Sequence, residues 1–127
     1  MRKTGLVKLI LTAALLSFSV SPAFAEGDAA AGEKVYKKCK TCHSLEAGKN
    51  KLGPHLAGVI GREAGSVEGF KYSKAMADSG LVWDEATLDA FLAKPKEVVP
   101  KSKMAFAGLK KEQQRQDLIA YLKEAAQ

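Results

Sequence analysis

Apolar residues recur at helical spacing in several parts of this chain, and no part shows a convincing strand pattern. The clearest helical case is the trio Leu88, Phe91 and Leu92, whose i, i+3, i+4 spacing puts them on one face. Asp84, a good helix N-cap, precedes the trio, and Pro95 follows it. A helix that ends at Pro95 is therefore predicted.

Helices are also predicted at both ends of the region after the leader. The first begins near Asp28, another good N-cap, and runs into residues 39–43, with Val35 and Tyr36 facing the core. The last covers residues 111–125. Its apolar stripe consists of Leu118, Ile119, Tyr121 and Leu122.

The chain between these helices is interrupted by turn residues. Residues 44–70 contain six glycines and are expected to form loops and turns. A short helix is predicted over residues 73–79, stopped by Gly80. Residues 98–104 have neither a helical nor a strand period and are expected to form an extended loop. These elements predict an all-α fold with one small core.

Residues 1–25 have the features of a secretory signal peptide. Three basic residues come first, residues 9–20 are almost wholly apolar, and residues 23–25 have the small-residue pattern of a cleavage site. The apolar run is shorter than the roughly 20 residues of a membrane span. We expect cleavage after Ala25, export to the periplasm and one mature domain of residues 26–127. An uncleaved anchor is the alternative.

The charge of the chain argues against a nucleic-acid partner. The formal charge is +6, and losing the three basic residues of the leader lowers it to +3. Such a mildly basic protein falls far short of the charge density of a nucleic-acid binder. Export also places the only two cysteines in an oxidising compartment, where a free pair tends to form a disulfide.

Those two cysteines, Cys39 and Cys42, are followed directly by His43. In a helical turn, residues three and four apart share a face, so the three side chains can point toward one object. The C-x-x-C-H motif is typical of covalent haem c attachment, with the imidazole on the iron. The leading prediction is therefore one haem c, bound through both cysteines.

Two alternatives stay open at this point. A redox disulfide would require a preceding strand, which the helix-like residues 29–36 do not provide. A structural zinc site would need four ligands, for which adjacent cysteine and histidine are awkward. The candidates for such a site are Cys39, Cys42, His43 and His55.

A haem iron bound by His43 keeps a sixth position, and Met104 is the best candidate to fill it. Met1 leaves with the leader, and Met76 falls in the predicted short helix, where methionine is usually a core residue. Met104 lies in the irregular loop, which can drape across the opposite haem face. The carbonyl of Pro54 can accept a hydrogen bond from the ring nitrogen of His43 that does not bind iron.

An ordered set of motifs runs through residues 26–127. The motifs are Cys39-Lys40-Thr41-Cys42-His43, Gly53-Pro54-His55-Leu56, Gly69-Phe70-Lys71-Tyr72, Trp83, Pro100-Lys101-Ser102-Lys103-Met104-Ala105-Phe106 and Leu118-Ile119-Ala120-Tyr121-Leu122. Together they resemble class I cytochrome c of the mitochondrial-like group and its bacterial periplasmic relatives. The resemblance implies a small all-α fold around one haem, with Gly32 and Tyr36 meeting the last helix near Tyr121. It also implies His43 and Met104 as axial ligands.

The resemblance further places four hydrogen-bond donors around the haem propionates, where they would satisfy a buried carboxylate. They are Arg62, Tyr72, Trp83 and Ser102. The chain also departs from the family pattern. Met76 and Phe91 stand where asparagine and tyrosine are common, Lys101 where glycine is common, and His55 where asparagine is common.

We therefore expect a soluble, monomeric one-electron carrier of the periplasm that is not an enzyme and does not insert stably into the membrane. Exposed lysines would steer it onto acidic faces of a quinol-oxidising complex, a terminal oxidase or a photosynthetic reaction centre. They are Lys37, Lys38, Lys40, Lys51, Lys96, Lys101 and Lys103. The alternative is a haem enzyme or sensor with a displaceable sixth ligand, because Lys101 could loosen the loop.

Overall fold

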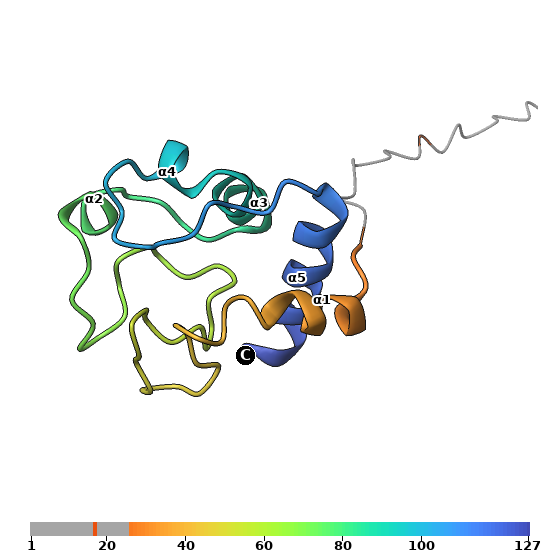
Figure 1. Cartoon of the computed structure of the whole chain (residues 1–127), viewed down its shortest axis with the longest axis horizontal. Coiled ribbons are helices and arrows are strands. Elements are labelled where there is room, and N and C mark those ends of the chain that lie inside the picture. The colour runs from red at the N-terminus through yellow and green to blue at the C-terminus, as the bar shows by residue number, and fades with distance from the viewer. Residues whose placement is uncertain (1–16, 18–25) are drawn as a thin grey trace, which may run out of the picture.

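The structure is a computed structural model that describes Ser17 and residues 26–127. The expected signal peptide, Ser17 apart, lies outside the described residues. The helices of residues 26–127 are α1 (Ala29–Tyr36), α2 (Lys74–Ala77), α3 (Glu85–Ala93), α4 (Pro95–Val98) and α5 (Glu112–Ala125) (Figure 1). The described part has no strand, and its only pairing of that kind is an isolated antiparallel bridge between Glu63 and Val82. The all-α prediction is confirmed.

The helices α1 and α5, from opposite ends of the described chain, cross at close range (Figure 1). A Cβ atom built on Gly32 would lie 1.9 Å from the carbonyl oxygen of Asp117, so no larger residue fits at the crossing. The rings of Tyr36 and Tyr121 pack with their centroids 5.4 Å apart. The predicted contact of Gly32 and Tyr36 with the last helix is therefore confirmed.

The helix α1 begins as predicted and ends earlier than predicted. The side chain of Asp28 accepts hydrogen bonds from the next helical amides and caps the helix. After Tyr36 the chain tightens, and the amide of Cys39 donates to the Tyr36 carbonyl over 2.7 Å. This i→i+3 bond belongs to a turn, so the predicted continuation of the helix into residues 39–43 is wrong.

The middle helices confirm two predictions and add one element. Ser73 caps α2 and Asp84 caps α3, each by accepting a hydrogen bond from an amide of the first turn. The helix α4 was not predicted, because Pro95 was expected only to end the preceding helix. In the structure Pro95 opens α4 at the first helical position, where its missing N–H removes no intrahelical bond.

The core lies between α3, α5 and the loops that cover them. Its largest buried members on these helices are Leu88, Phe91, Leu92, Leu118, Ile119 and Leu122. Cys39 and Met104, which lie far apart in the sequence, are both half-buried against this same core. The fold thus brings the cysteine motif and the loop that carries Met104 to one apolar core. Among the helices of the described residues, none is both long and apolar enough to span a bilayer.

Candidate functional site

The imidazole of His43 is held by the loop that follows it. Its Nδ1 donates a hydrogen bond to the carbonyl oxygen of Pro54 over 2.7 Å, the contact expected from the sequence. A carbonyl can only accept, so Nδ1 carries the proton and Nε2 keeps its lone pair. Burial lowers the pKa of His43, with the Pro54 carbonyl opposing the shift. Burial thus favours the neutral ring, and the bond to Pro54 leaves Nε2 as the nitrogen available to a metal.

The backbone of Gly53 packs directly on the His43 ring. A Cβ atom at this position would lie 2.4 Å from Cε1 of the imidazole. The hydroxyl of Tyr36 also donates to the carbonyl oxygen of His43 over 3.3 Å. The histidine is therefore fixed through its ring on one side and through its main chain on the other.

Cys39 and Cys42 lie free and half-buried on the turns after α1. Burial raises the pKa of the Cys39 thiol. Within the described residues, no three His, Cys, Asp or Glu side chains gather as a metal site. The zinc site considered from the sequence is therefore not formed. A helix, rather than the strand of a redox disulfide motif, precedes the two thiols.

Met104 lies half-buried in an irregular segment, and its amide donates to the hydroxyl of Ser102 over 3.3 Å. Just before it, the amide of Ser102 donates to the carbonyl of Val99 and closes a turn over Pro100 and Lys101. Lys101 has a φ of 64° and is the only non-glycine residue with a positive φ in the described part. Proline followed by a residue with positive φ is typical of a type II turn, which favours glycine at the Lys101 position.

Arg62 is half-buried and incompletely hydrogen-bonded. Its Nη1 donates to the carbonyl oxygens of His55 and Ala57 over 3.1 and 2.9 Å. Its Nε is buried and has no partner, and burial lowers the pKa of the guanidinium. A buried cationic donor without an acceptor fits a site that receives a carboxylate, such as a haem propionate.

The other three expected propionate donors come from separate loops. The hydroxyl of Tyr72 accepts a hydrogen bond from the amide of Val67 over 3.1 Å. Trp83 is buried, with its ring centroid 4.8 Å from that of Phe91. Ser102 is buried, and its hydroxyl accepts a hydrogen bond from the amide of Met104. The structure thus gives each of these three residues a local hydrogen-bonding or packing partner.

Three of the seven lysines expected to steer a partner also hold loops together. The Nζ atoms of Lys51 and Lys96 donate to the carbonyl oxygens of Lys40 and Ser102, both over 2.7 Å. Lys103 reaches the carbonyl of Lys71 over 3.4 Å. Sequence reasoning missed this structural role, because an exposed lysine carries no signal for a main-chain partner.

Asn50 is a second residue that sequence reasoning missed. Its side-chain oxygen accepts from the amide of His55 over 3.0 Å, and its nitrogen donates to the carbonyl of Glu68 over 3.4 Å. Asn50 therefore joins the loop after the cysteine motif to two later loops. In the sequence, Asn50 was only one residue of the glycine-rich stretch 44–70, which predicted loops and turns.

Comparisons with known proteins agree on one family. The cytochrome c family model matches residues 29–126. The chain is 50% identical to cytochrome c2 of Rhodomicrobium vannielii over 117 residues, covering 91% of this chain and 93% of that protein. It is 48% identical to cytochrome c2 of Blastochloris viridis, covering 92% of each. Its structure resembles cytochrome cH from Methylobacterium extorquens, with a TM-score of 0.72, 49% identity and coverage of 76% and 98% of the two chains.

Proposed function

The chain belongs to the cytochrome c family, and from that premise we propose that it is a soluble periplasmic one-electron carrier. It carries one haem c, bound covalently through Cys39 and Cys42. When bound, this group supplies one-electron exchange between Fe(II) and Fe(III). The proposal includes removal of residues 1–25 and release of residues 26–127 into the periplasm as a monomer.

The observation that carries the proposal is the fixed state of His43. Its Nδ1 is committed to the carbonyl of Pro54, so Nε2 would be the nitrogen that binds the haem iron. Met104, half-buried against the same core, would hold the iron through its sulfur. Ligation by one methionine and one histidine would raise the reduction potential relative to two histidines and would leave no position for a substrate. Arg62 supplies its unpartnered Nε to a propionate.

An enzyme or sensor with a displaceable sixth ligand is the competing function, and Lys101 is the observation that favours it. A side chain at a φ of 64° costs about 1–2 kcal/mol, and this cost falls in the segment that carries Met104. The segment is nevertheless held at Ser102 by the amide of Met104 and by Lys96. We therefore place the resting protein in the closed, carrier state.

Carbon monoxide added to the reduced protein at neutral pH separates the two functions. A closed carrier leaves the absorption spectrum unchanged, because Met104 occupies the position that the gas needs. Met104→Ala is the matched control, and it should bind carbon monoxide. Rapid stoichiometric binding by the unmodified protein would contradict the carrier function and support the enzyme or sensor.

The proposed partners are membrane redox complexes with acidic docking faces, among them a quinol-oxidising complex, a terminal oxidase or a reaction centre. Lys37, Lys38 and Lys40 are exposed beside the cysteine motif, and their charges would speed encounter. Electron transfer to an acidic partner should therefore slow steeply as salt rises. Lys40→Gln should slow it at low salt, whereas Lys123→Gln should not, because the charge of Lys123 is already paired with that of Glu85. A rate independent of salt would refute steering.

A further inference from the structure

The segment that carries Met104 returns to the core at Leu109, which is 3% exposed. The amide of Leu109 donates to the carbonyl of Leu92 at the end of α3 over 2.7 Å. A Cβ atom on the neighbouring Gly108 would lie 2.2 Å from the carbonyl oxygen of Ala93. Gly108 and Leu109 are thus packed against the end of α3 and form one end of the loop that carries Met104.

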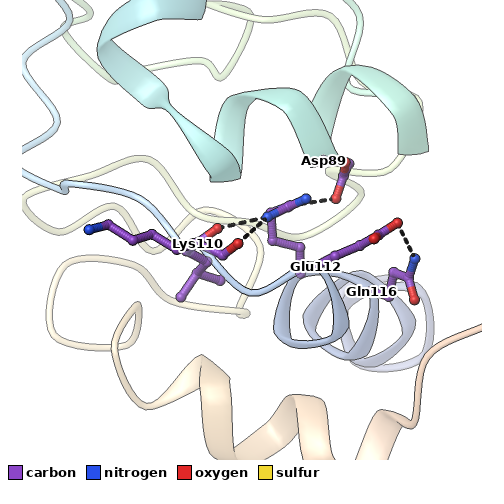
Figure 2. A network of polar contacts seen from close by, with 6 residues as sticks. Asp89, Lys110, Glu112 and Gln116 are labelled. Atoms are coloured by element: carbon purple, nitrogen blue, oxygen red, sulfur yellow. Dashed lines mark hydrogen bonds and ion pairs between the residues drawn. The ribbon is translucent and has the colours of Figure 1, made fainter.

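Arg115 holds this end from the other side. Its Nη1 donates to the carbonyl oxygens of Leu109 and Lys110 over 2.9 and 3.2 Å. Its Nε donates to Oδ1 of Asp89 over 2.8 Å. Figure 2 shows Asp89 projecting from α3 toward α5, with the main chain at Lys110 beside the same network. One guanidinium therefore joins α3, α5 and the incoming segment.

The Arg115–Asp89 pair differs from the surface ion pairs of the described chain. Its side chains are 13% and 21% exposed, whereas those of Lys94 and Glu97 are 67% and 70% exposed. Water and salt screen the inner pair less, so it holds a more definite geometry. The planar guanidinium also serves acceptors in several directions, which a lysine ammonium on a flexible stem does less well.

We propose that Arg115, oriented by Asp89, is a positioning residue for Met104. The inference rests on the proposed function, in which the Met104 sulfur binds the iron. Met104 lies only five residues before Leu109, so the anchor restricts where the sulfur can reach. A loop fixed at both ends has fewer conformations to lose when the sulfur binds. Loosening the end at Leu109 therefore weakens the methionine bond without unfolding the protein.

Imidazole competition in the oxidised holoprotein tests this inference. Imidazole replaces a weakly held methionine, and the replacement is followed by loss of the methionine-to-iron charge-transfer band. Arg115→Lys should raise the apparent imidazole affinity about tenfold, as expected when hydrogen bonds from a charged group are lost. Asp89→Asn keeps an oxygen acceptor and removes the charge, so it should give a smaller rise, about threefold. It also serves as the second variant if Arg115→Lys does not fold.

Asp117→Asn is the matched control on the same helix. Asp117 is 7% exposed and accepts hydrogen bonds from the amide of Asp28 and from Gln113, both over 2.8 Å, at the α1–α5 crossing. This variant should lower the unfolding midpoint and leave the imidazole affinity unchanged. The inference is overturned if Arg115→Lys and Asp89→Asn leave the affinity unchanged. It is equally overturned if Asp117→Asn raises the affinity as much, because general destabilisation would then be the cause.

The same experiment separates failure of this inference from failure of the proposed function. Met104→Ala should lack the charge-transfer band entirely. If the unmodified protein has the band, Met104→Ala loses it, and the Arg115 and Asp89 variants behave like the unmodified protein, only the positioning role fails. If the unmodified protein has no such band, the ligand assignment and the positioning role both fail.

Discussion

The two axial-ligand candidates sit in regions built in different ways. His43 is held by a 2.7 Å hydrogen bond to Pro54, by the close backbone of Gly53 and by a hydrogen bond from Tyr36 to its carbonyl. Met104 lies in a segment held mainly near its ends, and the turn before it contains the positive φ of Lys101. The His43 ring is thus fixed by several direct contacts, whereas the position of Met104 depends on the contacts at the two ends of its loop.

This structural difference matches the different roles proposed for the two residues. The histidine must present one nitrogen in one orientation, which close packing and a fixed tautomer achieve. In the proposed function, Met104 would need only to keep its sulfur at the iron, and a loop anchored at both ends would achieve this with fewer local contacts. Substitutions on the histidine side should therefore have large, all-or-none effects, and those on the methionine side should have small, graded ones.

Gly53→Ala should have the largest effect. The new methyl group would lie 2.4 Å from Cε1 of His43, and neither the ring nor the backbone can move without breaking the bond to Pro54. We expect a loss of about 3 kcal/mol in the free energy of unfolding, measured with denaturant on the holoprotein. Gly48→Ala is the control in the same loop. Gly48 has a φ of 80° and open space around it, so this change should cost only about 1 kcal/mol. Equal losses would show that the histidine loop is not closely packed.

Lys101→Gly should have an intermediate effect of the opposite sign. Glycine adopts a φ near 64° without strain, so the protein should gain about 0.5–1 kcal/mol after the extra chain entropy of glycine is subtracted. Thermal unfolding measures the gain. Lys103→Gly, at a position without a positive φ, should be destabilising instead. A Lys101→Gly protein no more stable than the unmodified one would show that the turn is unstrained.

Lys96→Met should have the smallest measurable effect. It keeps an apolar stem and removes the Nζ that donates to the carbonyl of Ser102 over 2.7 Å. The expected loss is about 0.5 kcal/mol in the free energy of unfolding by denaturant. Lys94→Met removes only an exposed pairing with Glu97 and should leave the stability unchanged. A loss in Lys94→Met as large as in Lys96→Met would show that the hydrogen bond from Lys96 to Ser102 does not stabilise the protein.

The elements that the sequence predicted well are those where several local signals agree. The helix α3 has a capping aspartate, an apolar trio and a closing proline, and its start, end and buried face all match. The helix α4 has four residues, too few to show a period, and Pro95 is compatible with either an end or a start. The end of α1 depends on turns stabilised by the packing of the cysteine motif, which no local propensity encodes.

In the site, too, features with a local sequence signal were predictable and features that depend on packing were not. The Pro54 contact with His43 was predictable, because a carbonyl at that spacing in a glycine-rich loop can fold back on the ring. The strained conformation of Lys101 explains physically why glycine is common at its position in the family. The Arg115–Asp89 pair joins residues 26 positions apart on two helices. Nothing local marks either residue, so only the packing of α3 against α5 reveals the pair.

The central claim is that His43 and Met104 close the iron from two sides, and the near-infrared spectrum of the oxidised protein at neutral pH tests it most directly. The methionine-to-iron charge-transfer band should be present in the unmodified protein, absent from Met104→Ala and retained in Met76→Leu. A band that survives Met104→Ala and disappears in Met76→Leu, or five-coordinate iron in the unmodified protein, would contradict the account.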